Sequence, residues 1–317
     1  VLGESALDAS VSGGNNTAIG KSTLTALTSG SNNVGLGYQA LASNTTGGTN
    51  TAVGSNALVT NTTASDNVAV GNGALLSNST GARNTALGTN ALDANTTASN
   101  NTAVGNQALG ANTTGTSNTA IGSESGKTQT TANNCTWVGV EAGRDNTGND
   151  NVAVGSGAMR LNTSGTRNTA VGTGIYGSTH GALSANTTGT RNTAFGNQTL
   201  LNNTTASNNT AIGAESLVQN TTGDNLVAIG ANALDANTTA SNNTAVGKDA
   251  LGANTTGTQN TAVGQASARA NTTGSNNTAV GQASLLENTT GSNNTAVGDD
   301  ALLANTTGTR NSALGAN

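Results

Sequence analysis

Apolar residues recur every 17 residues along most of this chain. Each repeat contains a tripeptide of the form Ala-Val-Gly, and the residue before its glycine is aliphatic or Phe in every copy, as in Val53, Leu87 and Phe195. We number each repeat from this glycine, which is position 0. Position −3 is mostly Thr or Val, and position +4 is mostly Leu. The consensus reads N-T-A-V-G-x-x-A-L-x-x-N-T-T-G-x-x.

This pattern predicts short β-strands. Residues at −3 and −1 lie on one face of an extended segment, and the Ala between them is small enough for a crowded opposite face. A second short strand is expected around the Leu at +4, with glycine-containing turns between the two strands. We expect the core of each repeat to consist of the aliphatic residue at −1 and this Leu. Helical repeats would instead be rich in Leu, Glu, Lys and Arg.

The chain, residues 1–317, forms a single array of 19 repeats. Only a 16-residue step (Gly139–Gly155) and a 24-residue step (Gly172–Gly196) interrupt the period. A disordered chain would not keep such a register. The array therefore predicts an all-β fold, namely a parallel β-solenoid or β-roll of about 19 coils in which identical positions stack on one another.

The Asn at position −4 supports this fold. It is present in almost every repeat and is replaced only by Cys135 and Leu226. Stacked Asn side chains can form a hydrogen-bonded ladder, and Asn tolerates the left-handed backbone of turns. We therefore interpret this column as structural.

Composition removes most functional classes. Aromatic residues are 1% of the chain, charged residues are 8%, and the net charge is −5 with Lys and Arg totalling 10. Such a chain has no basic surface for nucleic acid. One Cys and one His leave no disulfide framework, zinc cluster or His-based catalytic constellation. No apolar run approaches the ~20 residues of a membrane span. We expect neither an enzyme, nor a cofactor, nor a bound metal.

The repeats in residues 122–155 are irregular. Gly126 and Gly143 stand where Leu is expected, and the only Cys and the only Trp of the chain, Cys135 and Trp137, lie between them. We interpret Cys135 as a buried, unreactive thiol, because no acid–base partner accompanies it.

The longer step carries an insertion, residues 173–181, which includes Tyr176 and His180. Solenoids extrude insertions as loops, and exposed aromatic residues there can contact a receptor or a glycan. Trp137, Tyr176 and His180 are therefore the candidate receptor contacts. The alternative is a local bend or a packing plug between coils.

A further candidate is a column of N-glycosylation sequons at position +7, followed by Thr or Ser. The alternative is a turn in which the Asn and Thr side chains bond the backbone. The sequon asparagines are Asn44, Asn61, Asn78, Asn95, Asn112, Asn162, Asn186, Asn203, Asn220, Asn237, Asn254, Asn271, Asn288 and Asn305.

Regular Thr columns are also typical of ice-binding solenoids, which need T-x-T on one flat face. In this chain the Thr pairs are adjacent, as in Thr45 and Thr46, so their side chains point in opposite directions when extended. Ice binding is therefore the third of the functions considered.

The small core predicts association between chains. Burying one aliphatic side chain and one Leu per coil recovers far less free energy than ordering the backbone of a whole repeat costs. Lateral association would bury more surface, so we expect a homo-oligomer.

The segments N-N-T-A-V-G (Asn100–Gly105) and D-N-V-A-V-G (Asp66–Gly71) resemble the head repeats of trimeric autotransporter adhesins, the YadA-like head, and similar repeats of phage tail fibres. The resemblance covers all 19 repeats, although the period is longer and Asn replaces the Ser of the family motif. It implies a left-handed β-roll in which three chains form a rigid fibre.

Together these observations predict an extracellular structural or adhesive fibre segment, an adhesin head or a phage tail-fibre shaft, on a cell or virion surface. Its partners would be further copies of the chain and a host surface or glycan receptor. The alternative is a self-assembling surface filament, glycosylated or not, without a specific receptor. Because the chain begins and ends within a repeat, end-to-end stacking of such segments is also considered.

Overall fold

The fold is known from a computed structural model that describes residues 2–174 and 180–316. These residues form an all-β solenoid with one strand of three residues in almost every repeat and no helix. The strands are β1 (Thr17–Ile19), β2 (Val34–Leu36), β3 (Thr51–Val53), β4 (Val68–Val70), β5 (Thr85–Leu87), β6 (Thr102–Val104), β7 (Thr119–Ile121), β8 (Thr136–Val138), β9 (Val152–Val154), β10 (Thr169–Val171), β11 (Thr193–Phe195), β12 (Thr210–Ile212), β13 (Val227–Ile229), β14 (Thr244–Val246), β15 (Thr261–Val263), β16 (Thr278–Val280), β17 (Thr295–Val297) and β18 (Ser312–Leu314). In the first repeat a single parallel bridge, Leu2 to Ile19, takes the place of a strand.

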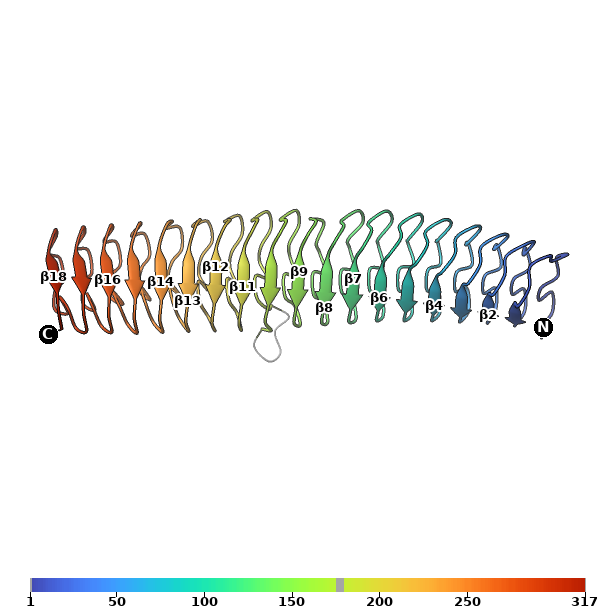
Figure 1. The fold of residues 1–317 in the computed structure, drawn as a ribbon, viewed down its shortest axis with the longest axis horizontal. Helices are drawn as coiled ribbons and strands as arrows, with labels where there is room; N and C mark the ends of the chain where they lie inside the picture. Colours follow the sequence, from blue (N-terminus) through green and yellow to red (C-terminus); the bar gives the residue numbers. More distant parts are fainter. Residues whose placement is uncertain (1, 175–179, 317) are drawn as a thin grey trace. The chain divides into compact units, whose positions relative to one another are not determined.

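The chain divides into two compact units, Val1–Asp150 with β1 to β8 and Asn151–Asn317 with β9 to β18. Within each unit, every strand pairs in parallel with the next strand along the chain (Figure 1). Partners are equivalent positions of adjacent repeats, as in β3 and β4, where Ala52 lies opposite Ala69. The predicted parallel solenoid with identical positions in register is therefore confirmed.

The strand residues face the opposite way from the one predicted. The Ala at −2 is fully buried, as in Ala52 and Ala103, whereas the residues on either side of it are partly or largely exposed. The alternation predicted that −3 and −1 share a face, but it did not say which face is inside. Beneath the strand the core is filled by the Ala at +3 and the Leu at +4, such as Ala57 and Leu58, which leaves room only for a methyl group at −2.

No second strand forms around this Leu. Positions +1 to +6 form a turn, and the Leu itself adopts the left-handed conformation, as in Leu58 with φ of 52°. That conformation costs a non-glycine residue about 1–2 kcal/mol. It is offset here because the side chain is fully buried and because the N–H of Leu58 donates to the carbonyl of Ala74 on the next coil at 3.0 Å.

Two ladders of buried Asn line this core. In the −4 ladder, Asn33 Oδ1 accepts the backbone N–H of Asn50 at 3.0 Å. In the +7 ladder, Asn61 Nδ2 donates to Asn44 Oδ1 at 2.9 Å. The carbonyl of Gly47 accepts a hydrogen bond from both Asn33 and Asn44, each at 2.9 Å, so the two ladders meet at position +10.

These bonds confirm the structural interpretation of the −4 column, with one correction. The left-handed residue is its predecessor in the chain, as in Asn32 with φ of 60° and Asn100 with φ of 64°. The side chain of the Asn at −4 forms the hydrogen bonds of the ladder, while the residue at −5 adopts the left-handed backbone conformation of the turn.

Candidate functional sites

Trp137 is not a surface residue. It occupies position −2 of β8, where other repeats have Ala, and it is 0% exposed. An added Cβ at Gly126 would lie 2.6 Å from its Cδ1 atom, and one at Gly143 would lie 2.6 Å from its Cζ3 atom. The indole thus fills the space of two missing Leu side chains, so it cannot contact a receptor in this structure. The packing-plug interpretation explains these repeats.

The neighbours of Trp137 are adapted to it. Gln129 replaces the Asn at +7, accepts a hydrogen bond from the indole N–H at 3.0 Å and donates to the carbonyl of Ala132 at 3.0 Å. Because Gln129 is engaged in this way, Asn112 Oδ1 on the preceding coil is buried without a hydrogen-bond partner. Cys135 is buried, and its Sγ lies 3.4 Å from the carbonyl oxygen of Gly148.

The insertion contributes one described candidate. Tyr176 lies outside the described residues. His180 is exposed and lines a groove of about 240 Å³ with Gln198, Leu201 and Asn202. His180 and Trp137 belong to different units.

The sequon asparagines form the buried +7 ladder. All of them are 0% exposed except Asn305, which is partly buried. Their amide groups donate along the ladder and to the carbonyl at +10, as Asn95 does to Asn78 at 2.8 Å and to Ala98 at 3.1 Å. The following Thr also bonds between coils, since Thr96 Oγ1 donates to the carbonyl of Thr113 at 3.2 Å. The folded chain therefore uses these amides as turn and ladder groups and does not present them at its surface.

In each unit the outward face of the strands carries an exposed apolar row, although the sequence predicted these residues to be buried. Position −1 is aliphatic or Phe in every strand, and position −3 is Thr, Val or Ser, so neither column contains a charged residue. Leu87 is 47% exposed, Ile121 is 43% exposed and Phe195 is 55% exposed. The clue in the sequence was the Ala at −2, which is nearly invariant because only a methyl group fits inside.

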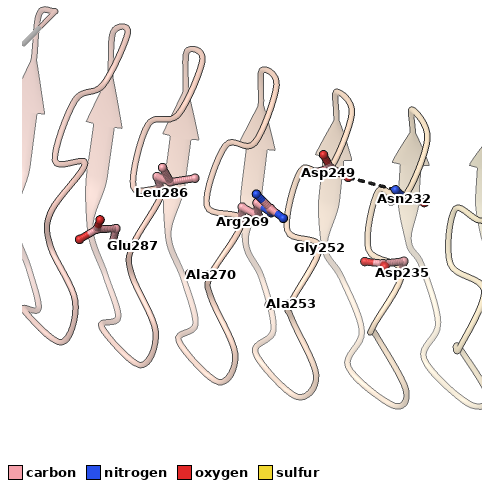
Figure 2. Close-up of a pocket in the computed structure, with 9 residues that line it drawn as sticks. All are labelled: Asn232, Asp235, Asp249, Gly252, Ala253, Arg269, Ala270, Leu286 and Glu287. Carbon is pink, nitrogen blue, oxygen red and sulfur yellow. Dashed lines mark hydrogen bonds between the residues drawn. The ribbon is translucent and has the colours of Figure 1, made fainter.

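A second surface feature runs along position +5, directly after the buried Leu. In the unit Asn151–Asn317 a groove of about 590 Å³ crosses several coils (Figure 2). Asp235 and Arg269 lie on either side of the coil that carries Gly252. Asn232 lies on the same coil as Asp235, and Glu287 lies one coil beyond Arg269. Asn232 Nδ2 donates to Asp249 Oδ1 at 3.1 Å.

An equivalent groove of about 280 Å³ lies in the unit Val1–Asp150 and is lined by Asp93, Gly110 and Lys127. Partial burial removes water from both carboxyl groups and raises the pKa of Asp93 and of Asp235, an effect reduced by hydrogen bonds from nearby backbone N–H groups. Asp249 and Glu215 raise the pKa of Asp235 further by charge repulsion.

No protein-family model matches this chain, and no curated protein matches it. The described residues contain no helix that is long and apolar enough to cross a membrane. Within the same ranges, no group of three or more His, Cys, Asp or Glu side chains is arranged to hold a metal ion.

Proposed function

We propose that this chain is a structural segment of an extracellular fibre in which several copies associate through the outward face of their sheets. The observation that carries the proposal is the exposed apolar row at position −1. Soluble monomers rarely expose large contiguous apolar patches, and such patches usually mark interaction surfaces. This row repeats at every coil, so the surface it fits best is another extended and equally periodic surface.

A second copy of the same chain provides that surface. The row contains no charge, so two such faces can approach without burying an unpaired ion. Association also compensates for a core made of Ala, Leu and Asn, which is small for the amount of backbone it orders. The trimeric state and the left-handed coil are implied by the resemblance to adhesin heads and phage tail fibres, as is the location on a cell or virion surface.

The interior supports a mechanical role. Asn ladders and inter-coil backbone hydrogen bonds connect each coil to the next throughout both units. Bending a coil away from its neighbour would break several buried hydrogen bonds together, each worth about 1 kcal/mol net and more when a partner is left unsatisfied. A chain built in this way is suited to act as a stiff spacer that carries repeated surface groups, which favours multivalent contact.

The test is the mass of the protein in solution by light scattering. We expect a trimer for the natural chain and dissociation in a variant with Leu87→Glu and Ile121→Glu, because each change places a carboxylate in the apolar row. The matched control carries Thr80→Glu and Thr114→Glu, which are exposed at position +9 on other parts of the same coils. A monomeric natural chain at high concentration, or equal dissociation by both variants, would contradict the proposal.

Ice binding, the third of the functions considered from the sequence, would use a different face from the one first considered. In most strands the outward face presents Thr at −3 beside the aliphatic residue at −1, as in Thr102 and Val104 of β6. Rows of uncharged side chains at the regular spacing of parallel strands could order water. The two functions use the same surface, so a monomer that reshapes ice crystals would replace the oligomer proposal. Particle length in electron micrographs would separate a discrete segment from a self-assembling filament.

A further inference from the structure

The two grooves at position +5 are built by two separate segments of the chain that have nearly the same sequence. Residues 92–105 are identical to residues 234–247, and residues 108–116 are identical to residues 250–258. The next coils differ in sequence, S-E-S-G-K-T at residues 123–128 and Q-A-S-A-R-A at residues 265–270. Both nevertheless have a basic residue at position +5, namely Lys127 and Arg269. Each unit therefore contains an Asp, a Gly and a cation at position +5 of three successive coils.

Gly110 and Gly252, on the middle coil of each groove, leave the groove open because they have no side chain. Their backbone conformation does not require glycine. Neither Gly110 nor Gly252 has the positive φ that excludes other residues. Other repeats carry Leu at this position, as in Leu76 and Leu201. An added Cβ at Gly252 would lie 3.2 Å from Asp235 Oδ1, so any larger side chain there would crowd the carboxylate.

The charges on the two walls do not neutralise each other. Within the described residues there is no ion pair between Asp93 and Lys127 or between Asp235 and Arg269. Lys127 pairs instead with Glu124 on its own coil at 3.2 Å, and Arg269 is exposed. Positions two coils apart are separated by ~9.6 Å, which is too far for a direct contact between side chains that project in parallel.

A ligand with both charges would bridge this distance. Two charge-assisted hydrogen bonds of ~2.8 Å, one at each wall, leave ~4 Å between the charged groups of the ligand itself. That separation suits an ammonium group joined by a short chain to a phosphate or carboxylate. The carboxyl groups of Asp93 and Asp235 are half-buried and form no ion pair across the groove, and the ammonium group of such a ligand would supply a cation there.

We propose that each groove binds a small zwitterion, with its ammonium group at Asp93 or Asp235 and its acidic group at Lys127 or Arg269. Gly110 and Gly252 form the floor that lets the ligand lie across the coil. This proposal goes beyond the fibre function and is independent of it, because each groove lies within one chain.

The experiment is a calorimetric titration of the full chain with phosphoethanolamine. We expect two sites per chain, and binding weaker by about tenfold or more for ethanolamine or inorganic phosphate alone, because each lacks one of the two charge-assisted contacts. A variant with Gly110→Leu and Gly252→Leu should lose both sites, and either single variant should keep one. Leu occupies this position in other repeats, so the fold should tolerate the change.

The matched control is Ala42→Leu, a position +5 outside both grooves, which should leave binding unchanged. A second arm measures co-sedimentation with vesicles that contain phosphatidylethanolamine. Binding to vesicles that the double Leu variant abolishes identifies a lipid headgroup as the source, and binding of the free probe alone identifies a soluble molecule. No saturable binding in either arm, or full binding by the double Leu variant with an unchanged circular dichroism spectrum, would overturn the proposal. Light scattering on the same samples measures the oligomeric state independently, so failure of ligand binding and failure of the oligomer proposal can be distinguished.

Discussion

The indole of Trp137 occupies the space that Gly126 leaves free, because an added Cβ at Gly126 would lie 2.6 Å from Trp137 Cδ1. Trp137→Ala restores the usual residue at −2 but leaves a cavity opposite two glycines. We expect a loss of about 3–5 kcal/mol in the free energy of unfolding. Gly126→Leu alone should also destabilise the fold, because the new side chain collides with the indole.

Combining Trp137→Ala with Gly126→Leu and Gly143→Leu should restore much of the lost stability, because the triple variant has the ordinary Ala and Leu of the repeat. Denaturant unfolding of all the variants measures this coupling. If the effects of the three substitutions simply add, the side chains are not packed against one another as described.

The glycine at position 0 cannot carry a side chain. Gly105 has φ of +137°, and an added Cβ would lie 2.5 Å from the carbonyl oxygen of Gly122. Gly105→Ala should therefore destabilise its unit by several kcal/mol, since both the backbone conformation and the distance between coils must change. Gly14→Ala is the control, because a Cβ there would meet no atom within 4 Å. Thermal melting of the two variants should differ clearly, and similar melting curves would be inconsistent with the coil spacing.

The +7 ladder requires an amide. Asn61→Asp removes the group that donates to Asn44 Oδ1 at 2.9 Å and to the carbonyl of Ala64 at 3.0 Å, and it buries a charge. We expect a loss of about 3–5 kcal/mol at pH 7, part of which is recovered at acidic pH as the carboxyl group becomes protonated. Asn72→Asp, at an exposed position of the neighbouring coil, should have little effect. Circular dichroism melts at pH 7 and pH 4 would test both variants, and a stable Asn61→Asp at neutral pH would refute the ladder.

Asp235 should make the protein more stable as the pH falls. Partial burial raises its pKa, so the folded chain binds the proton more tightly than the unfolded chain. The unfavourable contribution of the charged form is therefore complete above the raised pKa and disappears as the pH falls below the unfolded value of about 3.9. Asp235→Asn should raise the melting temperature at pH 7 and lose this advantage near pH 3. An advantage that is the same at both pH values would show that the ionisation of Asp235 has no part in it.

The sequence by itself determined the coil. A 17-residue period, β-branched residues around a small Ala, and Asn in one column were sufficient for an all-β parallel solenoid. They were sufficient because a stacked ladder requires each position to repeat the one below it, and this requirement is visible as periodicity. Composition argued against helical repeats in the same way, because the chain is rich in Asn, Thr and Gly.

Only the tertiary structure decided which side of the strand is inside. Alternation groups Thr102 with Val104 and separates both from Ala103, but it is equally compatible with either face toward the core. The width of the coil, set by the Leu at +4 in its left-handed conformation, admits only the methyl group. The same limit explains why Trp137 fits inside only where two Leu side chains are missing. Burial depends on distances across the coil, and the alternation of residues within a strand contains no information about those distances.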